Sequence, residues 1–352
     1  MGRTAMNTFP RLVIGRRRLL AATLTGVVSL GLAACGRSGG RGSAGSSGSA
    51  SSGSQGWPRT VKTDDGDLAL SSKPQRIVST SIALTGSLLA VGAPVVASAV
   101  TAPNTDGLSD DSGFFVQWSD AAKKQKVEKL YEIKSVDVTK VAGYEPDLIV
   151  VAKSGGDSAA DQVEQLRDIA PVLVVDYTGR SWQDVTRTIG QATGNEQQAD
   201  TVIADYDAHV SATKEAITVP EGTTSAFIVY GGGGGGAAAL TAESPQVQIL
   251  TSLGFTMADI PEEVKGDTSK GQRQDIVKLS NENVQTGLPG DNWVIVAADS
   301  ASRQKVVNDP TFSTATQVTH GRVAYTPAST FRLDYYSAVI MLDSLKESYK
   351  KG

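Results

Sequence analysis

The stretch from Gly194 to Ile217, GNEQQADTVIADYDAHVSATKEAI, decides the fold of this chain. Its apolar and small side chains recur at intervals of three, four and seven residues, at Ala199, Val202, Ile203, Tyr206, Val210, Thr213 and Ile217. This spacing is the period of a helix that buries one face against a core. Because no glycine or proline interrupts the stretch after Gly194, we predict a single helix of about six turns over 194–217.

On each side of this helix, short apolar segments alternate with helical patterns. The strand-like segments are 76–79, 94–100, 147–151 and 172–175 before the helix, and 226–230 and 293–297 after it. Such alternation favours parallel sheets covered by helices. We therefore predict an α/β protein of two Rossmann-like lobes, 57–193 and 218–352, with mostly parallel sheets. Because ligands of open α/β sheets bind beyond the carboxyl ends of the strands, we expect the site in a cleft between the lobes.

The first 34 residues have the pattern of a secretory signal. A basic segment ending in Arg18 precedes an apolar segment, 19–32, that is too short to span a bilayer. The sequence then reads Leu-Ala-Ala-Cys, which resembles a bacterial lipobox, so Cys35 is expected to become a lipid-modified N-terminus. A plainer interpretation is that Cys35 only ends the apolar segment. The arginines loosely match a twin-arginine signal, so both export routes remain open.

Residues 36–56 are almost entirely glycine and serine and predict a flexible tether. A lipid on Cys35 followed by this tether would hold the folded part at the outer face of the cytoplasmic membrane. Removal of the signal leaves 28 of the 33 basic residues against 37 acidic ones, a formal charge of −9. This acidic balance argues against nucleic acid as a partner. Because Cys35 is the sole cysteine, disulfides and thiolate metal sites are excluded.

The residue inventory offers little to an enzyme. The two histidines, His209 and His320, have no second ligand at metal-site spacing, so no metal site is predicted. No nucleophile elbow, zinc-hydrolase or phosphate-loop motif is present. The glycine run 231–236 satisfies a dinucleotide pattern trivially, but no amphipathic helix follows at 237–240, so we interpret it as a loop on the rim of the cleft. We expect a binding protein without catalysis and without a resident cofactor.

Basic and aromatic residues are the remaining candidates for a ligand site. They are Trp118, Lys126, Lys129 and Tyr131 in the first lobe, and Arg273 and Arg332 in the second. Arginine beside aromatic rings suits a planar, anionic ligand, because the guanidinium pairs with charge while the rings stack.

Several motifs together resemble the ferric-enterobactin-binding proteins of bacterial ABC importers. They are PQRIVSTS at 74–81, LTGSLLA at 84–90, QWS at 117–119, GGDSA at 155–159 and FRLDYYSA at 331–338. The resemblance covers nearly all of 57–349, and PDLI at 146–149 occurs throughout the wider iron-siderophore and cobalamin-binding class. It implies a class III periplasmic binding protein fold, with two lobes, one long helix and no catalysis.

The resemblance also implies a ligand and a partner. The ligand would be a ferric siderophore of the catecholate type, a trianion whose iron is already coordinated, and an ABC permease would receive it. Arg273 and Arg332 match family positions suited to the ligand's charge. Carboxylates on the lobe tips dock onto permease arginines in this class. Glu282 matches the position in the second lobe, whereas the first-lobe position falls on Thr139 and leaves Asp137 as a substitute. A monomer is expected.

The sequence departs from this family at three places. Relatives carry arginines at the position of Val116 and near 104–106, and a tryptophan at the position of Leu240. Lys126 and Lys129 are candidates to compensate for the missing charge. A different catecholate or a mixed-ligand siderophore therefore stays open.

Three alternatives remain from the sequence. Haem or a corrinoid would be another ligand of the same class, with His320 or a tyrosine available to haem iron. An extracytoplasmic hydrolase would belong to another class, although no nucleophile–base pair is identifiable. A lipoprotein with an adhesive or signalling role would bind no small ligand.

Overall fold

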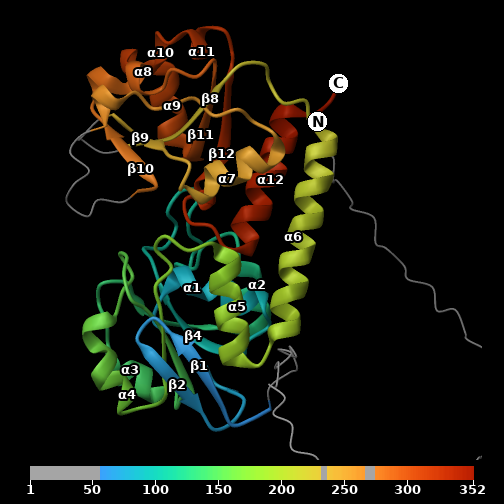
Figure 1. Cartoon of the computed structure of the whole chain (residues 1–352). Helices are drawn as coiled ribbons and strands as arrows, with labels where there is room; N and C mark the ends of the chain where they lie inside the picture. The colour runs from blue at the N-terminus through green and yellow to red at the C-terminus, as the bar shows by residue number, and fades with distance from the viewer. Residues whose placement is uncertain (1–55, 231–235, 266–273) are drawn as a thin grey trace, which may run out of the picture. The chain divides into compact units, whose positions relative to one another are not determined.

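The computed structural model describes residues 56–230, 236–265 and 274–352. Within these residues the chain forms two five-stranded sheets and a two-stranded hairpin, with helices packed on the sheets (Figure 1). We call the unit built on strands β3 to β7 the N-lobe and the unit built on β8 to β12 the C-lobe. The predicted fold class, an α/β protein with two Rossmann-like lobes, is confirmed.

The N-lobe sheet has the strand order β5-β4-β3-β6-β7, and all of its paired strands are parallel. The strands are β3 (Ile77–Ser79), β4 (Val95–Val100), β5 (Glu128–Glu132), β6 (Leu148–Ala152) and β7 (Val172–Val175). The helices are α1 (Ile82–Ala90), α2 (Ser119–Gln125), α3 (Val138–Gly143), η1 (Ala160–Gln162), α4 (Val163–Arg167) and α5 (Trp182–Thr193). An antiparallel hairpin, β1 (Arg59–Thr63) and β2 (Gly66–Leu70), precedes them.

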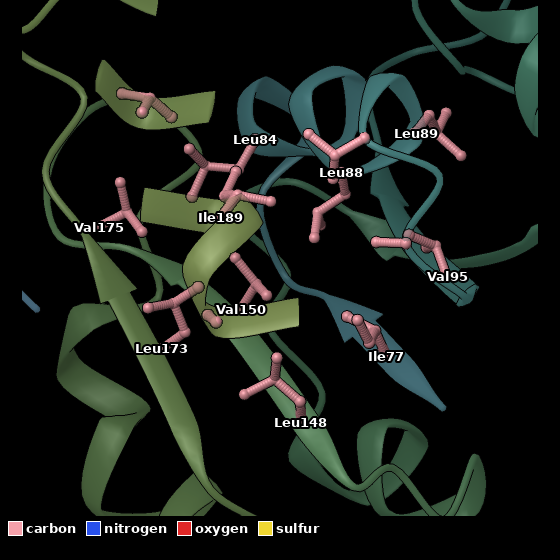
Figure 2. Close-up of a cluster of buried hydrophobic side chains, with 14 of the residues drawn as sticks. Ile77, Leu84, Leu88, Leu89, Val95, Leu148, Val150, Leu173, Val175 and Ile189 are labelled. Atoms are coloured by element: carbon pink, nitrogen blue, oxygen red, sulfur yellow. The ribbon is translucent and has the colours of Figure 1, made fainter. Parts of the chain in front are cut away.

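Both faces of the N-lobe sheet are buried, as continuous apolar strands predict. Successive side chains of a strand point to opposite faces, so Leu148 and Val150 belong to one core and Ile149 and Val151 to the other. Figure 2 shows the first core, where leucines of α1 and Ile189 of α5 lie over strand residues. Because cores pack on both faces of the sheet, each strand is held in place along its length. The position at which each strand ends and the following loop begins is therefore also fixed.

The C-lobe sheet has the order β10-β9-β8-β11-β12. Its strands are β8 (Thr224–Val229), β9 (Ala237–Leu240), β10 (Ile276–Leu279), β11 (Asn292–Ala298) and β12 (Val323–Pro327). The longer helices are α7 (Pro245–Leu253), α9 (Ser300–Asn308) and α12 (Tyr335–Tyr349). The short ones are η2 (Glu262–Val264), η3 (Asn281–Asn283), α8 (Val284–Gly287), α10 (Pro310–Ser313), α11 (Thr316–Thr319) and η4 (Ala328–Thr330).

Two C-lobe strands, β9 and β10, were not expected from the sequence. Ala237–Leu240 forms β9, which runs antiparallel to β8 on one side and to β10 on the other. Alanine has weak strand propensity, but all four residues are buried between these neighbours, and the pairing overrides the propensity. The glycines at 231–235 lie outside the described residues.

The predicted long helix is α6 (Glu196–Ala216), 21 residues in length. Ala199 packs into a core of the N-lobe, whereas Val202, Ile203 and Tyr206 pack into a core that contains residues of α7 and α12. The helix contacts α5 on one side and α7 and α12 on the other, and Figure 1 shows it running beside both lobes. The apolar stripe of the sequence is therefore divided between the two lobes.

Candidate functional site

Loops from both lobes meet beyond the carboxyl ends of the strands, where open α/β sheets place their ligands. Arg332 follows β12 and η4 in the C-lobe, and Tyr177 follows β7 in the N-lobe. The Arg332 Cζ lies 5.0 Å from the centroid of the Tyr177 ring and 5.6 Å from that of Phe331. A guanidinium at this distance from an aromatic face makes a cation–π contact. Arg332 is half-buried, and 42% of Phe331 is exposed.

A buried carboxylate holds the Tyr177 ring in place. The Tyr177 hydroxyl donates to Asp157 Oδ1 at 2.6 Å. Asp157 Oδ2 accepts from the Ser81 hydroxyl at 2.5 Å and from the Ala83 amide at 2.9 Å, both at the start of α1. Asp157 is 6% exposed and belongs to the segment GGDSA. Burial raises the pKa of Tyr177, and Asp157 raises that pKa further, while the positive charge of Arg332 lowers it.

Gly155, two residues before Asp157, is required by this arrangement. Gly155 has a φ of +98°, and a Cβ there would lie 1.9 Å from the Tyr177 hydroxyl oxygen. Only glycine tolerates this conformation and this close approach together.

The lobes also meet at the start of α9. The Ser300 amide of the C-lobe donates to Asp106 Oδ2 of the N-lobe at 3.0 Å. This hydrogen bond lowers the pKa of Asp106. A carboxylate at a helix N-terminus is favoured by the helix dipole. Relatives were expected to carry an arginine in the loop 104–106. In this chain the loop instead contributes the Asp106 carboxylate to the contact between the lobes.

A third contact joins α12 to α1. Asp334 is 4% exposed and caps α12 by accepting from the Ser337 amide at 2.9 Å. Burial raises the pKa of Asp334 to about 6, against hydrogen bonds from Ser337 and Gln117 that favour the charged form. The Ser337 hydroxyl donates to the Arg332 carbonyl oxygen at 2.9 Å. The cap of α12 therefore also fixes the backbone of Arg332.

Of the six ligand-binding residues predicted from the sequence, Arg332 lies at this junction, and Arg273 lies outside the described residues. Trp118 was expected to face the ligand, but it is 1% exposed and packs against Phe114 and Phe115. Tyr131 is 4% exposed in the other core of the N-lobe. Neither ring offers a face to a ligand in this structure.

The two predicted lysines lie elsewhere on the N-lobe. Lys126 ends α2 and precedes β5, beside Gln125, whose side chain donates to the Ala93 carbonyl oxygen just before β4 begins. Lys126 is therefore at the amino ends of the strands, whereas Tyr177 lies at their carboxyl ends. Lys129 is exposed on the edge strand β5 and pairs with Glu132 at 3.5 Å. The structure gives no support to the expectation that these lysines replace missing arginines.

The remaining predicted residues are on the surface or outside the described residues. Asp137 caps α3 by accepting from the Lys140 amide at 3.0 Å, and Glu282 is exposed in η3, so both docking assignments stay predictions. Cys35 lies outside the described residues.

The histidines have structural partners. His209 Nε2 lies 2.8 Å from Asp343 Oδ1 and links α6 to α12, and His320 Nδ1 lies 2.8 Å from the Thr316 carbonyl oxygen. Over 56–230, 236–265 and 274–352, no group of three or more His, Cys, Asp or Glu side chains is placed to hold a metal ion.

Sequence reasoning missed Tyr177, Asp157 and Asp106. Tyr177 stands two residues beyond the end of a continuous apolar strand, which is a signal for a site position in a parallel sheet. Asp157 lies in a motif quoted for the family resemblance, but nothing in the sequence indicates that its partner is Tyr177. Asp106 lies in the loop where an arginine was expected.

A cavity of about 370 Å³ lies away from this junction. Its lining includes hairpin residues together with Arg167 and Val172. Val172 is the first residue of β7, whereas Tyr177 follows the last, so the cavity and Arg332 lie at opposite ends of that strand. Arg167 is already paired with Asp65 at 2.5 Å.

Among the helices in the described residues, none has the length and apolarity needed to cross a membrane.

Comparison with known proteins agrees with this architecture. The sequence pattern of the periplasmic binding protein family matches residues 77–330. The chain is 42% identical over 290 residues to the ferric enterobactin-binding periplasmic protein FepB of Escherichia coli O6:H1, covering 82% of this chain and 90% of FepB.

Two solved structures extend the comparison to three dimensions. The crystal structure of holo-ViuP matches with a TM-score of 0.74 and 31% identity, covering 84% of this chain and 97% of ViuP. The periplasmic catecholate-siderophore binding protein VctP of Vibrio cholerae, at a TM-score of 0.57 and 18% identity, shares the fold; the match covers 82% of this chain and 98% of VctP. The chain therefore belongs to the periplasmic binding protein family, as the motifs of its sequence indicated.

Proposed function

We propose that this protein is an extracytoplasmic solute-binding protein that captures a ferric siderophore of the catecholate type and delivers it to an ABC permease. The observation that carries the proposal is the 42% identity to the ferric enterobactin-binding protein FepB across 90% of its length. Identity of this extent spans both lobes and the loops between them. It therefore supports a common ligand class as well as a common fold.

The geometry at the lobe junction supports an anionic ligand. Among the ion pairs of the described residues, none includes Arg332, and its guanidinium rests on an aromatic ring. A ferric tris-catecholate carries three negative charges and brings its iron already coordinated. Such a chelate requires positive charge and aromatic surface from the protein, and it requires no metal ligands. Arg273 is proposed to supply the second positive charge.

The proposal includes the membrane location and the partner. Lipidation of Cys35 and the tether at 36–56 would hold the protein, as a monomer, on the outer face of the cytoplasmic membrane. Glu282 and Asp137 are the proposed contacts of the two lobes with the permease. Binding and release of an intact chelate involve no catalysis and no resident cofactor.

The direct test is a titration of the purified protein with a panel of ligands, followed by tryptophan fluorescence and isothermal calorimetry. The panel contains ferric enterobactin, ferrichrome as a hydroxamate, hemin and cobalamin. We expect saturable quenching by ferric enterobactin and an affinity for ferrichrome that is at least a hundredfold lower. A Soret band with hemin and no response to the catecholate would instead support haem binding and contradict the proposal.

A further inference from the structure

The Tyr177 side chain is anchored at its hydroxyl. Its hydroxyl donates to the buried Asp157, which is itself held by Ser81 at the start of α1. The backbone of Gly155 lies close to the hydroxyl, which occupies the space that a Cβ at this position would need. The ring is thus a rigid surface of the N-lobe, and Arg332 of the C-lobe lies on it.

This anchoring excludes one role for Tyr177 and leaves another. A tyrosine that binds iron does so as the phenolate, but this hydroxyl is committed to a carboxylate at 2.6 Å and is held in its neutral form by that neighbour and by burial. The oxygen is therefore unsuited to metal binding. The face of the ring is what the residue presents to the opposite lobe.

A cation–π contact leaves the charge of the arginine in place. The Arg332 Cζ lies over the Tyr177 ring, and the positive charge is attracted to the face of the ring without being neutralised. Among the hydrogen bonds and ion pairs of the described residues, none uses a donor of the Arg332 guanidinium, so the Tyr177 ring can hold Arg332 without occupying its five N–H groups. A carboxylate partner would hold the arginine as firmly but would cancel the charge that an anionic ligand needs.

We infer that Tyr177 is the positioning residue for Arg332. It fixes the guanidinium across the lobe junction with its donors free for an anionic chelate that presents oxygen atoms, such as a catecholate. The inference rests on the proposed function for the identity of the ligand. The stack itself is a property of the ligand-free protein, and it can be measured without any siderophore.

The ligand-free test uses the reaction of phenylglyoxal with arginine, followed by mass spectrometry of the full chain. In Tyr177→Leu the ring is lost, and Arg332 is expected to react at least threefold faster than in the wild type. Arg303 is the internal reference, because its stack on Tyr325, at 4.6 Å, is untouched by this substitution. An unchanged ratio of the Arg332 rate to the Arg303 rate would overturn the inference, whatever the protein binds.

The second test measures affinity for ferric enterobactin. Tyr177→Leu is expected to bind at least tenfold more weakly. Tyr177→Phe keeps the ring but loses the hydrogen bond to Asp157, so it is expected to retain more affinity than Tyr177→Leu. Tyr325→Leu, the matched control, is expected to stay within threefold of wild type. In an Arg332→Ala background, Tyr177→Leu is expected to cause no further loss. Equal losses in both backgrounds would show that Tyr177 acts independently of Arg332 and would reject the positioning role.

Arg332→Lys covers the case in which Tyr177→Leu fails to fold. Arg332 is half-buried and makes no ion pair among the described residues, so this variant is expected to fold normally. Lysine keeps the charge but lacks the flat group that stacks, and at least a tenfold loss of affinity is expected. Wild-type affinity in Arg332→Lys would refute the inference. Failure of the wild type to bind any catecholate would refute the proposed function alone.

Discussion

Gly86 on α1 and Asp334 at the start of α12 fit so closely that a Cβ on Gly86 would lie 2.2 Å from the Asp334 Oδ2. The same Cβ would lie 2.9 Å from Cδ1 of the buried Trp118. This contact joins the two lobes two residues after Arg332 in the chain. The absence of a side chain at one position thus sets how near the arginine-bearing loop comes to the N-lobe.

Gly86→Ala is expected to lower the free energy of unfolding by about 1–3 kcal/mol, because the methyl group overpacks a fully buried contact. Urea unfolding measured by circular dichroism checks this value. Gly143→Ala is the matched control, since nothing lies within 4 Å of its Cβ position. If both variants unfold at the same urea concentration, the contact between α1 and α12 is not close-packed.

Arg332→Ala is expected to weaken binding of ferric enterobactin by about 2–5 kcal/mol, the range for truncating one member of a desolvated charge pair. Fluorescence titration measures the change. Arg322→Ala is the control, because Arg322 is exposed and precedes β12, whereas Arg332 follows the same strand. Equal affinities of the two variants would contradict a ligand-binding role for Arg332.

Asp334 is expected to make stability fall as the pH rises. Its pKa in the folded protein is about 6, against 3.8 as the ordinary value. Below pH 3.8 the Asp334 carboxyl group is protonated in both the folded and the unfolded protein. Between pH 3.8 and about 6 it ionises only in the unfolded protein. The contribution of Asp334 to the free energy of unfolding should therefore drop by about 3 kcal/mol across this interval and remain level above it.

Comparison of wild type with Asp334→Asn isolates this effect, since asparagine still caps the helix but does not titrate. The wild-type curve should fall more steeply between pH 4 and 6. Asp309→Asn is the control of opposite sign: hydrogen bonds from Thr311 lower the pKa of Asp309, so its contribution is lost as the pH falls. Parallel curves for wild type and Asp334→Asn would show that Asp334 is solvated.

Val202→Ala tests the packing of α6. Val202 is 4% exposed in the C-lobe core, and its truncation is expected to lower the free energy of unfolding by about 1–3 kcal/mol. Val307→Ala, on α9 and 59% exposed, makes the same chemical change on a surface and should alter stability by less than about 0.5 kcal/mol. Chemical denaturation of the two variants gives the comparison.

Cys35→Ser is expected to abolish incorporation of labelled palmitate and to move the protein from the membrane fraction to the soluble fraction. No other cysteine can take the lipid, because the chain has one. Ser43→Ala, in the tether, should leave labelling unchanged. Persistent membrane association of an unlabelled Cys35→Ser protein would point to another anchor.

The fold followed from patterns that act over short distances. The stripe from Ala199 to Thr213 predicted α6, and the apolar runs within 147–151 and 172–175 predicted the buried parallel strands β6 and β7. Each of these signals reflects burial on a helix period or on both faces of a strand. β9 carried no such signal, because four alanine and leucine residues become a strand only when β8 and β10 pair with them.

The sequence by itself determined the α/β class, the long helix, the family motifs and Arg332 as a candidate ligand contact. Tertiary structure alone decided which loop residues meet. It put Trp118 and Tyr131 inside the cores, placed Lys126 at the far edge of the sheet, and brought Tyr177 under Arg332. Periodicity encodes which face of an element is buried. It does not encode which loops of two separate sheets come together, because that depends on how the elements pack in three dimensions.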